Sequence, residues 1–136
     1  MSSPAEIVRT ARAGHAVVGW KLSSHARDDL LLQLPPRYEK TIADHITLSA
    51  KVASGTPTPE DCRGEIVGRI DDGVGVEALV LEIEGSHTRP DGGTWHITWS
   101  LAAGRRPNDS NDVLAGQQWS PLEEPIKVQL KGARIR

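Results

Sequence analysis

The tripeptide His-Ile-Thr occurs twice in this chain, as "HITLS" at 45–49 and "HITWS" at 96–100. The unperturbed pKa of histidine lies near neutrality, so one imidazole can accept a proton while a second, protonated one donates a proton. The hydroxyl of threonine can donate a hydrogen bond to a phosphate oxygen. Two such copies side by side could cleave a phosphodiester without a metal. His45 and His96 would be the acid–base pair, and Thr47 and Thr98 would hold the phosphate.

Both copies lie in segments rich in β-favouring residues, and the side chains of a strand point alternately to its two faces. The histidine, threonine and serine of each copy should therefore share one polar face. Ile46 and Ile97 should belong to the apolar faces on the opposite side. Ser49 and Ser100 are weaker candidates, because either hydroxyl can satisfy a backbone group along the strand. The common register of the two copies favours a functional site over a chance sheet pattern.

A metal site would be the alternative use of these histidines. Zinc sites usually have three or four ligands with local pairs such as HxH or CxxC. His45 and His96 each have a threonine two residues on, and Cys62 is isolated. We therefore expect neither a metal nor another cofactor. A single cysteine, the absence of a signal-like apolar start and the absence of a membrane-spanning run predict a soluble cytoplasmic protein with no membrane partner.

The composition is that of an ordinary globular chain of one domain. The 136 residues are 38% hydrophobic and 25% charged, with a formal net charge of −2. A charge near zero argues against a protein that grips long duplexes through many phosphates, but it allows a small pocket for one phosphate. The chain has four tryptophans and no phenylalanine, so we expect the tryptophans to fill the core.

The elements that must position the two motifs can be read from periodicity and turn residues. Helices are expected after a cap at Ser23 or Ser24, ending before Pro35, and near Ser110 or Asn111. Strands are expected at 15–22, 44–53, 65–70, 76–85, 94–102 and 126–135. This order predicts an α+β fold with a mainly antiparallel sheet and few helices. Residues 1–13 are expected to be a polar lead-in, and 14–136 a single domain.

The segments "HITL" at 45–48 and "HITW" at 96–99 resemble the paired H-x-[ST]-hydrophobic motifs of the two-histidine (2H) phosphoesterases. This superfamily includes 2′,3′-cyclic-nucleotide phosphodiesterases, 2′-5′ RNA ligase-like proteins and phage enzymes that destroy cyclic-oligonucleotide signals. The surrounding sequence looks like its small bacterial and phage members. The resemblance implies the same catalytic and phosphate-binding residues as above, without saying which histidine is the base. It also implies two lobes around a central cleft. With no helix predicted between the motifs, we expect a trimmed second lobe.

Four further residues are candidate substrate contacts. Arg89 lies in a flexible loop before the second motif and could reach a phosphate, or it could simply be solvated. Arg37 and Tyr38 follow a Pro-Pro pair and could offer a charge and a stacking ring, although a packed surface tyrosine is the alternative. Lys21 should point away from Trp20 and could border the cleft.

These observations predict a monomeric, metal-independent phosphodiesterase that hydrolyses a 2′,3′-cyclic phosphate or a related nucleotide or RNA-end phosphodiester. One alternative is a hydrolase of cyclic oligonucleotide signals. A second is a nucleotide- or RNA-binding module that no longer cleaves, and a third is a structural protein in which the repeat is only a sheet pattern. The presence of both histidines and both threonines favours an enzyme over a binding module.

Overall fold

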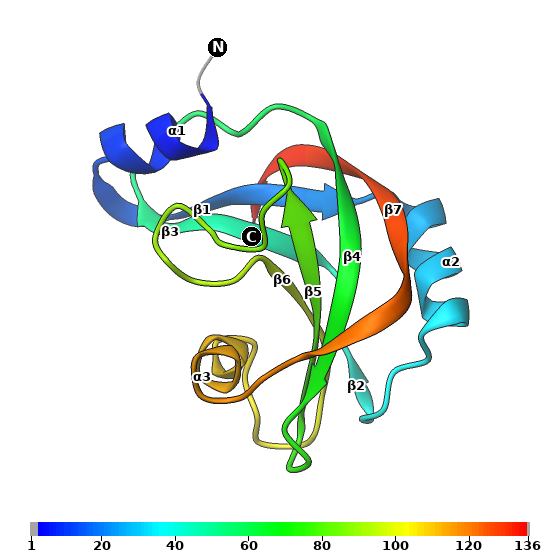
Figure 1. Ribbon diagram of the computed structural model, residues 1–136. Coiled ribbons are helices and arrows are strands. Elements are labelled where there is room, and N and C mark those ends of the chain that lie inside the picture. The colour runs from blue at the N-terminus through cyan, green and yellow to red at the C-terminus, as the bar shows by residue number, and fades with distance from the viewer. Residues whose placement is uncertain (1–2, 136) are drawn as a thin grey trace.

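The computed structural model describes residues 3–135, and it confirms an α+β fold with antiparallel strands (Figure 1). The first two residues of the expected lead-in lie outside the described residues, as does the last residue of the chain. The elements in chain order are α1 Pro4–Thr10, β1 Ala13–Leu22, α2 Ser24–Gln33, β2 Lys40–Thr41, β3 His45–Val52, β4 Cys62–Asp71, β5 Val76–Ile83, β6 His96–Leu101, α3 Asp109–Gly116 and β7 Ser120–Ile135.

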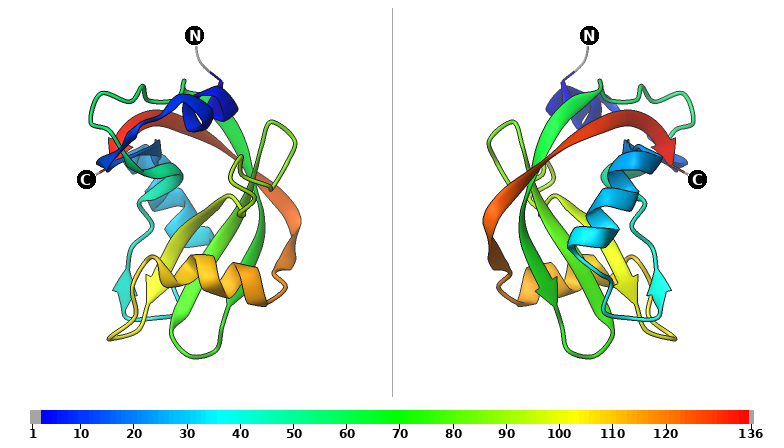
Figure 2. Two further views of the ribbon diagram at one scale, coloured as in Figure 1. Left: turned by 90° about the vertical axis from the view of Figure 1, so that its left-hand side faces the viewer. Right: turned by 90° about the vertical axis from the view of Figure 1, so that its right-hand side faces the viewer.

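Six strands close into a barrel, in the order β6-β3-β1-β7-β4-β5 and back to β6. Each pairing is antiparallel, and the short β2 pairs with the end of β6 beyond β3, on the same edge as β3. The three helices lie outside the wall (Figure 1, Figure 2). The barrel does not confirm the expectation of two lobes around a central cleft. Both motif strands are instead neighbours in one wall.

The interior of the barrel is filled by the apolar faces of the strands. Ile46 and Ile97, which separate the histidine and threonine of each motif, are both fully buried there. Three of the four tryptophans are also buried, which confirms that they fill the core. The rings of Trp20 and Trp95 meet edge to face with their centroids 5.3 Å apart, a favourable arrangement for two aromatic rings. Because the interior is apolar, the polar faces of the motifs must lie on the outside of the wall.

Helix α3 covers part of that outer wall through a second, smaller apolar cluster. Val113 of α3 packs there with Val76 and Ala78 of β5 and Leu101 of β6. The helix begins at Asp109, close to the predicted start. This packing holds the first turn of α3 beside the second motif.

The sequence predicted helix α2 but not helix α1. Helix α1 replaces the expected polar lead-in: Ser3 accepts a hydrogen bond from the amide of Glu6, and Ile7 is buried in the main core. Val8 and Ala11 also pack against this core, but so short an apolar pattern was too weak a periodic signal to predict the helix. Ser23 caps α2 as predicted, accepting from the amide of Ala26 at 3.1 Å. Within residues 3–135, none of the helices combines the length and apolar character that a membrane crossing requires.

Candidate active site

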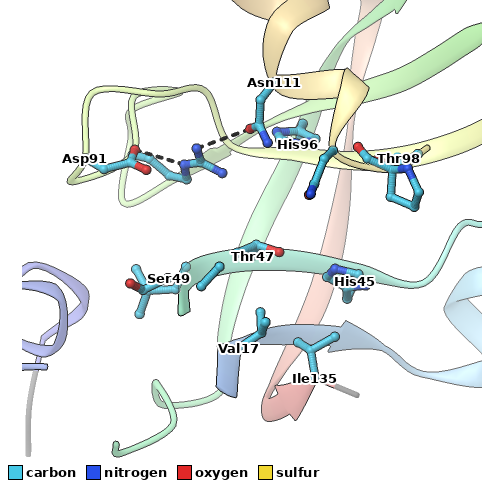
Figure 3. Close-up of a pocket in the computed structure, with 14 residues that line it drawn as sticks. Val17, His45, Thr47, Ser49, Asp91, His96, Thr98, Asn111 and Ile135 are labelled. Carbon is cyan, nitrogen blue, oxygen red and sulfur yellow. Dashed lines mark hydrogen bonds and ion pairs between the residues drawn. The ribbon is translucent and has the colours of Figure 1, made fainter. Parts of the chain in front are cut away.

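The two motifs line one cavity of about 460 Å³ on the outer face of the wall, between β3 and β6 (Figure 3). His45 and Thr47 reach it from β3, and His96 and Thr98 reach it from β6. The alternation predicted from the sequence therefore places all four side chains together. A volume of this size lies within the range of pockets that hold small molecules, roughly 300–1,000 Å³.

The pairing of β3 with β6 sets how the four side chains face one another. Ile46 lies opposite Ile97 in an antiparallel ladder. In such a ladder the residue on one side of Ile46 lies opposite the residue on the other side of Ile97. His45 therefore faces Thr98, and Thr47 faces His96, as Figure 3 shows. This crosswise arrangement gives each imidazole a hydroxyl from the other strand.

His96 is held as a neutral ring whose proton lies on Nδ1. The ring is 8% exposed, and its Nδ1 lies 2.8 Å from the carbonyl oxygen of Thr94. A carbonyl can only accept, so Nδ1–H is the donor and the lone pair of Nε2 is left for the cavity. Burial lowers the pKa of His96 and outweighs the hydrogen bond to Thr94, which raises it; Arg89 and His45 lower it further. A neutral imidazole with a free Nε2 is suited to act as a general base.

His45 is held differently, by the residue that precedes it. Its Nδ1 lies 3.1 Å from Oδ2 of Asp44, and this carboxylate can serve as the counter-charge of an imidazolium. The side chain of His45 is 26% exposed, so it has more access to solvent than His96. Protonated, it has an Nε2–H that can be donated within the cavity. This ring is suited to the role of general acid.

The two threonines also differ. The hydroxyl of Thr98 lies 2.9 Å from that of Ser110 and 3.3 Å from the carbonyl oxygen of Pro107, to which it can donate. Ser110, in the first turn of α3, is fully buried. Thr47 has no hydrogen bond from its side chain to any residue in the range 3–135, so its hydroxyl is free to bind a ligand.

Arg89, a candidate phosphate contact from its loop position, lines the same cavity. Its Nε donates to Asp91 at 3.0 Å and its Nη2 to Oδ1 of Asn111 at 3.3 Å (Figure 3). Gly93 leaves room for it, because a Cβ there would come within 2.5 Å of Nη2. Burial alone would raise the pKa of Asp91, but the amide of Gly93 and the guanidinium of Arg89 outweigh it and hold that pKa below its usual value. The loop thus presents a fixed cation to the cavity.

The two serines of the motifs, Ser49 and Ser100, lie in different surroundings. Ser49 lines the cavity, whereas Ser100 is fully buried elsewhere and donates to Glu77 at 2.6 Å. The expectation that Ser100 shares a face with Thr98 is wrong. The ladder between β5 and β6 shifts register there: Ala78 pairs with Thr98, but Glu77 pairs with Ser100. This bulge interrupts the strict alternation of the strand.

Three of the candidate substrate contacts do not line this cavity. The hydroxyl of Tyr38 donates to Asp71, and this bond, together with burial, raises the pKa of Tyr38. Arg37 pairs with Asp71 at 3.1 Å, and its backbone amide donates to the buried Glu77. The two side chains thus belong to an ion-pair network that fixes the segment after α2. Lys21 lies opposite His45 in the ladder of β1 with β3 but does not reach the cavity.

Several residues of the site were not recognised in the sequence. Asp44 had a visible signal, because an acidic residue directly precedes the first histidine. Asp91 and Asn111 had none, since they act through Arg89, which only the folded loop brings to them. Ser110 was considered only as a helix cap. In the part of the chain that the structure describes, no three histidine, cysteine, aspartate or glutamate side chains converge as metal ligands.

Comparison with other proteins does not assign the chain to a family. No family model matches it, and no curated protein or solved structure is significantly similar to it. The 2H phosphoesterases are therefore only a resemblance, carried by the two His-Ile-Thr motifs.

Proposed function

We propose that this chain is a metal-independent phosphodiesterase of the 2H type, acting on a 2′,3′-cyclic phosphate or a related nucleotide or RNA-end phosphodiester. The observation that carries the proposal is the crosswise placement of two histidine–threonine pairs in one cavity. The two lobes of a 2H enzyme would correspond here to the two halves of the barrel that contain β3 and β6. The second half, with α3 as its helix, would be the trimmed one.

The histidines divide the proton transfers between them. Nε2 of neutral His96 takes a proton from a water molecule, whose oxygen forms a bond to phosphorus. Nε2–H of protonated His45 gives a proton to the ribose oxygen as its bond to phosphorus breaks. The product is a phosphomonoester, and each histidine ends in the protonation state from which the other started. Exchange with solvent then restores both rings.

The remaining polar groups stabilise the charge that develops on the non-bridging oxygens. The free hydroxyl of Thr47 donates to one of them. Thr98 can donate to a second, in place of the carbonyl oxygen of Pro107, while it accepts from Ser110. Arg89 supplies the fixed positive charge that a neutral His96 does not, and such preorganised donors stabilise a transition state strongly.

A panel of phosphodiesters tests the function and selects among its forms. We expect turnover of at least one member of a set containing 2′,3′-cyclic mononucleotides, an RNA end with a cyclic phosphate, cyclic oligonucleotides and 2′-5′-linked RNA. Activity should survive EDTA. Loss of activity with EDTA that added metal restores would contradict a metal-independent mechanism. Tight binding of these compounds without turnover would favour the nucleotide-binding alternative.

A further inference from the structure

A strained residue lies between β2 and β3, two positions before the first histidine. Ala43 is fully buried and has a φ of 44°, in the left-handed region that residues other than glycine seldom adopt. Its amide donates to the carbonyl oxygen of Thr98 at 3.0 Å. Its own carbonyl accepts from Nε of Arg27 in α2 at 2.8 Å. Such a conformation persists only where the surrounding structure fixes it, and strained residues are frequent at functional sites.

The strain coincides with a change of register along β6. Thr41 lies opposite Ser100, and Ile46 lies opposite Ile97. Between these two pairs lie four residues, 42–45, on one side and two residues, 98 and 99, on β6. Ile42 and Ala43 still donate to the carbonyl oxygens of Trp99 and Thr98 in the register of β2, so the two extra residues follow directly after Ala43. We call residues 42–45 the Ala43 bulge. Arg27 also reaches the carbonyl of Ile42 at 3.5 Å, so its guanidinium lies against the bulge.

The register shift decides which side chains meet in the cavity. If the register of β2 continued without the bulge, His45 would lie opposite His96 and Thr47 opposite Thr94. With the two extra residues, His45 faces Thr98 and Thr47 faces His96. The bulge therefore converts an arrangement of two opposed imidazoles into the crosswise arrangement of the site.

We propose that Arg27 and Ala43 are positioning residues that set the register of the two histidine–threonine pairs. Arg27 holds the carbonyl side of the bulge, while the amide of Ala43 ties it to the backbone of Thr98. Neither side chain lines the cavity. The effect on catalysis rests on the proposed function, but the effect on register is a property of the fold alone.

The test combines a cross-strand contact with a rate. Arg27→Met removes the donors and keeps an apolar stem, and Arg27→Lys restores a single donor. Arg134→Met is the matched control, because Arg134 also donates to a backbone carbonyl, that of Thr56, away from the bulge. NMR reports the contact between Ile46 and Ile97 in each folded variant. Turnover is measured on the best substrate of the panel.

We expect Arg27→Met to weaken the Ile46–Ile97 contact and to lower kcat about 10–100-fold with a smaller change in KM, since misplacement of reacting groups by an ångström has effects of this size. Arg27→Lys should recover part of the Ile46–Ile97 contact and part of kcat, and Arg134→Met should change neither the contact nor kcat. Ala43→Gly should keep the contact and unfold at or above the temperature of the unaltered chain, because glycine adopts this φ without strain.

Three results would overturn or separate the proposals. An intact contact and full kcat in Arg27→Met would overturn the positioning role. A lower kcat with the contact intact would also overturn it, because Arg27 would then act by another route. If the unaltered chain turns over no member of the panel, the proposed function fails. Loss of the contact in Arg27→Met but not in Arg134→Met would still support the role of Arg27 in the register. Should Arg27→Met not fold, Arg27→Lys and Ala43→Val, whose branched side chain disfavours positive φ, provide the same two readouts.

Discussion

The two copies of His-Ile-Thr have the same letters but lie in different surroundings. The β6 copy is flanked by β5 on one side and by β3 and β2 on the other, and the first turn of α3 covers it. The β3 copy lies between β6 and β1. His45 is half-buried, whereas His96 is buried. The comparison teaches that a repeated motif need not make a symmetric site.

The partners of the two rings follow the same division. Nδ1 of His96 donates to the neutral carbonyl of Thr94, and Nδ1 of His45 donates to the charged carboxylate of Asp44. Burial lowers the pKa of His96 and so favours its uncharged imidazole, whereas Asp44 gives Nδ1–H of His45 a charged acceptor. The assignment of His96 as base and His45 as acid rests on this difference.

The largest effect is expected when each histidine is replaced in turn, which tests whether the two rings have different roles. His96→Gln and His45→Gln should each lower turnover about 10²–10⁴-fold, the usual contribution of a general acid or base. The acidic limb of the pH profile of kcat/KM should belong to His96, with a midpoint below the ordinary histidine value of about 6.5 because burial lowers its pKa. His96→Gln should remove this acidic limb.

The control for both variants is structural. Each should retain the far-UV circular dichroism and the cooperative unfolding of the unaltered chain. If His45→Gln removed the acidic limb instead, the acid and base roles would be exchanged. Full turnover in both variants would place the chemistry outside this cavity.

Local alternation in the sequence predicted which motif residues share a face, but it did not predict the strand pairings around them. Alternation along a strand placed His45 and Thr47, and separately His96 and Thr98, on one polar face each. It failed at Ser100, because a bulge depends on the partner strand. Closure of the barrel through β5 and β6 was likewise a long-range pairing that no local pattern encodes.

The same limit explains why only one of the four candidate substrate contacts, Arg89, lines the cavity. A loop arginine or tyrosine is positioned by whatever the fold brings next to it. Arg37 and Tyr38 both bond to Asp71, which lies 34 and 33 residues further along the chain. Arg89 instead bonds to Asp91 and Asn111 at the cavity. Sequence alone could not separate these outcomes, since all three residues occur in similar polar segments.

Replacing each of the two threonines should change the stability of the protein by a different amount. Thr98→Val leaves the buried hydroxyl of Ser110 without its partner, which should lower the free energy of unfolding by about 1–3 kcal/mol. Thr47→Val removes no protein hydrogen bond and should change stability much less, while it raises KM. Urea unfolding and steady-state kinetics on both variants measure the contrast. Equal losses of stability would show that the second copy is not the more tightly embedded one.

The buried ring should also leave a trace in the pH dependence of stability. Below about pH 6.5 the unfolded chain protonates this histidine, whereas the lowered pKa keeps the folded one neutral. The unfolded state then binds more protons, so the free energy of unfolding decreases as the pH falls through this value. The decrease ends below the folded pKa. His96→Gln should flatten this part of the curve relative to the unaltered chain. A slope that persists unchanged in His96→Gln would show that the ring is not desolvated.

Asp44 should give the smallest effect, and it tests whether the first ring needs a charge or only an orientation. Asp44→Asn keeps an oxygen that can accept from Nδ1–H of His45 but removes the carboxylate charge. Since Asp44 is half exposed, such a pair contributes at most about 1 kcal/mol, so kcat should fall no more than about fivefold. Asp44→Ala also removes the acceptor that orients the ring, so its kcat should be lower still. Added salt should reduce the difference in kcat between Asp44→Asn and the unaltered chain. Equal rates for Asp44→Ala and Asp44→Asn would show that the charge alone matters, and a much larger loss in Asp44→Asn would make Asp44 part of the proton transfer itself.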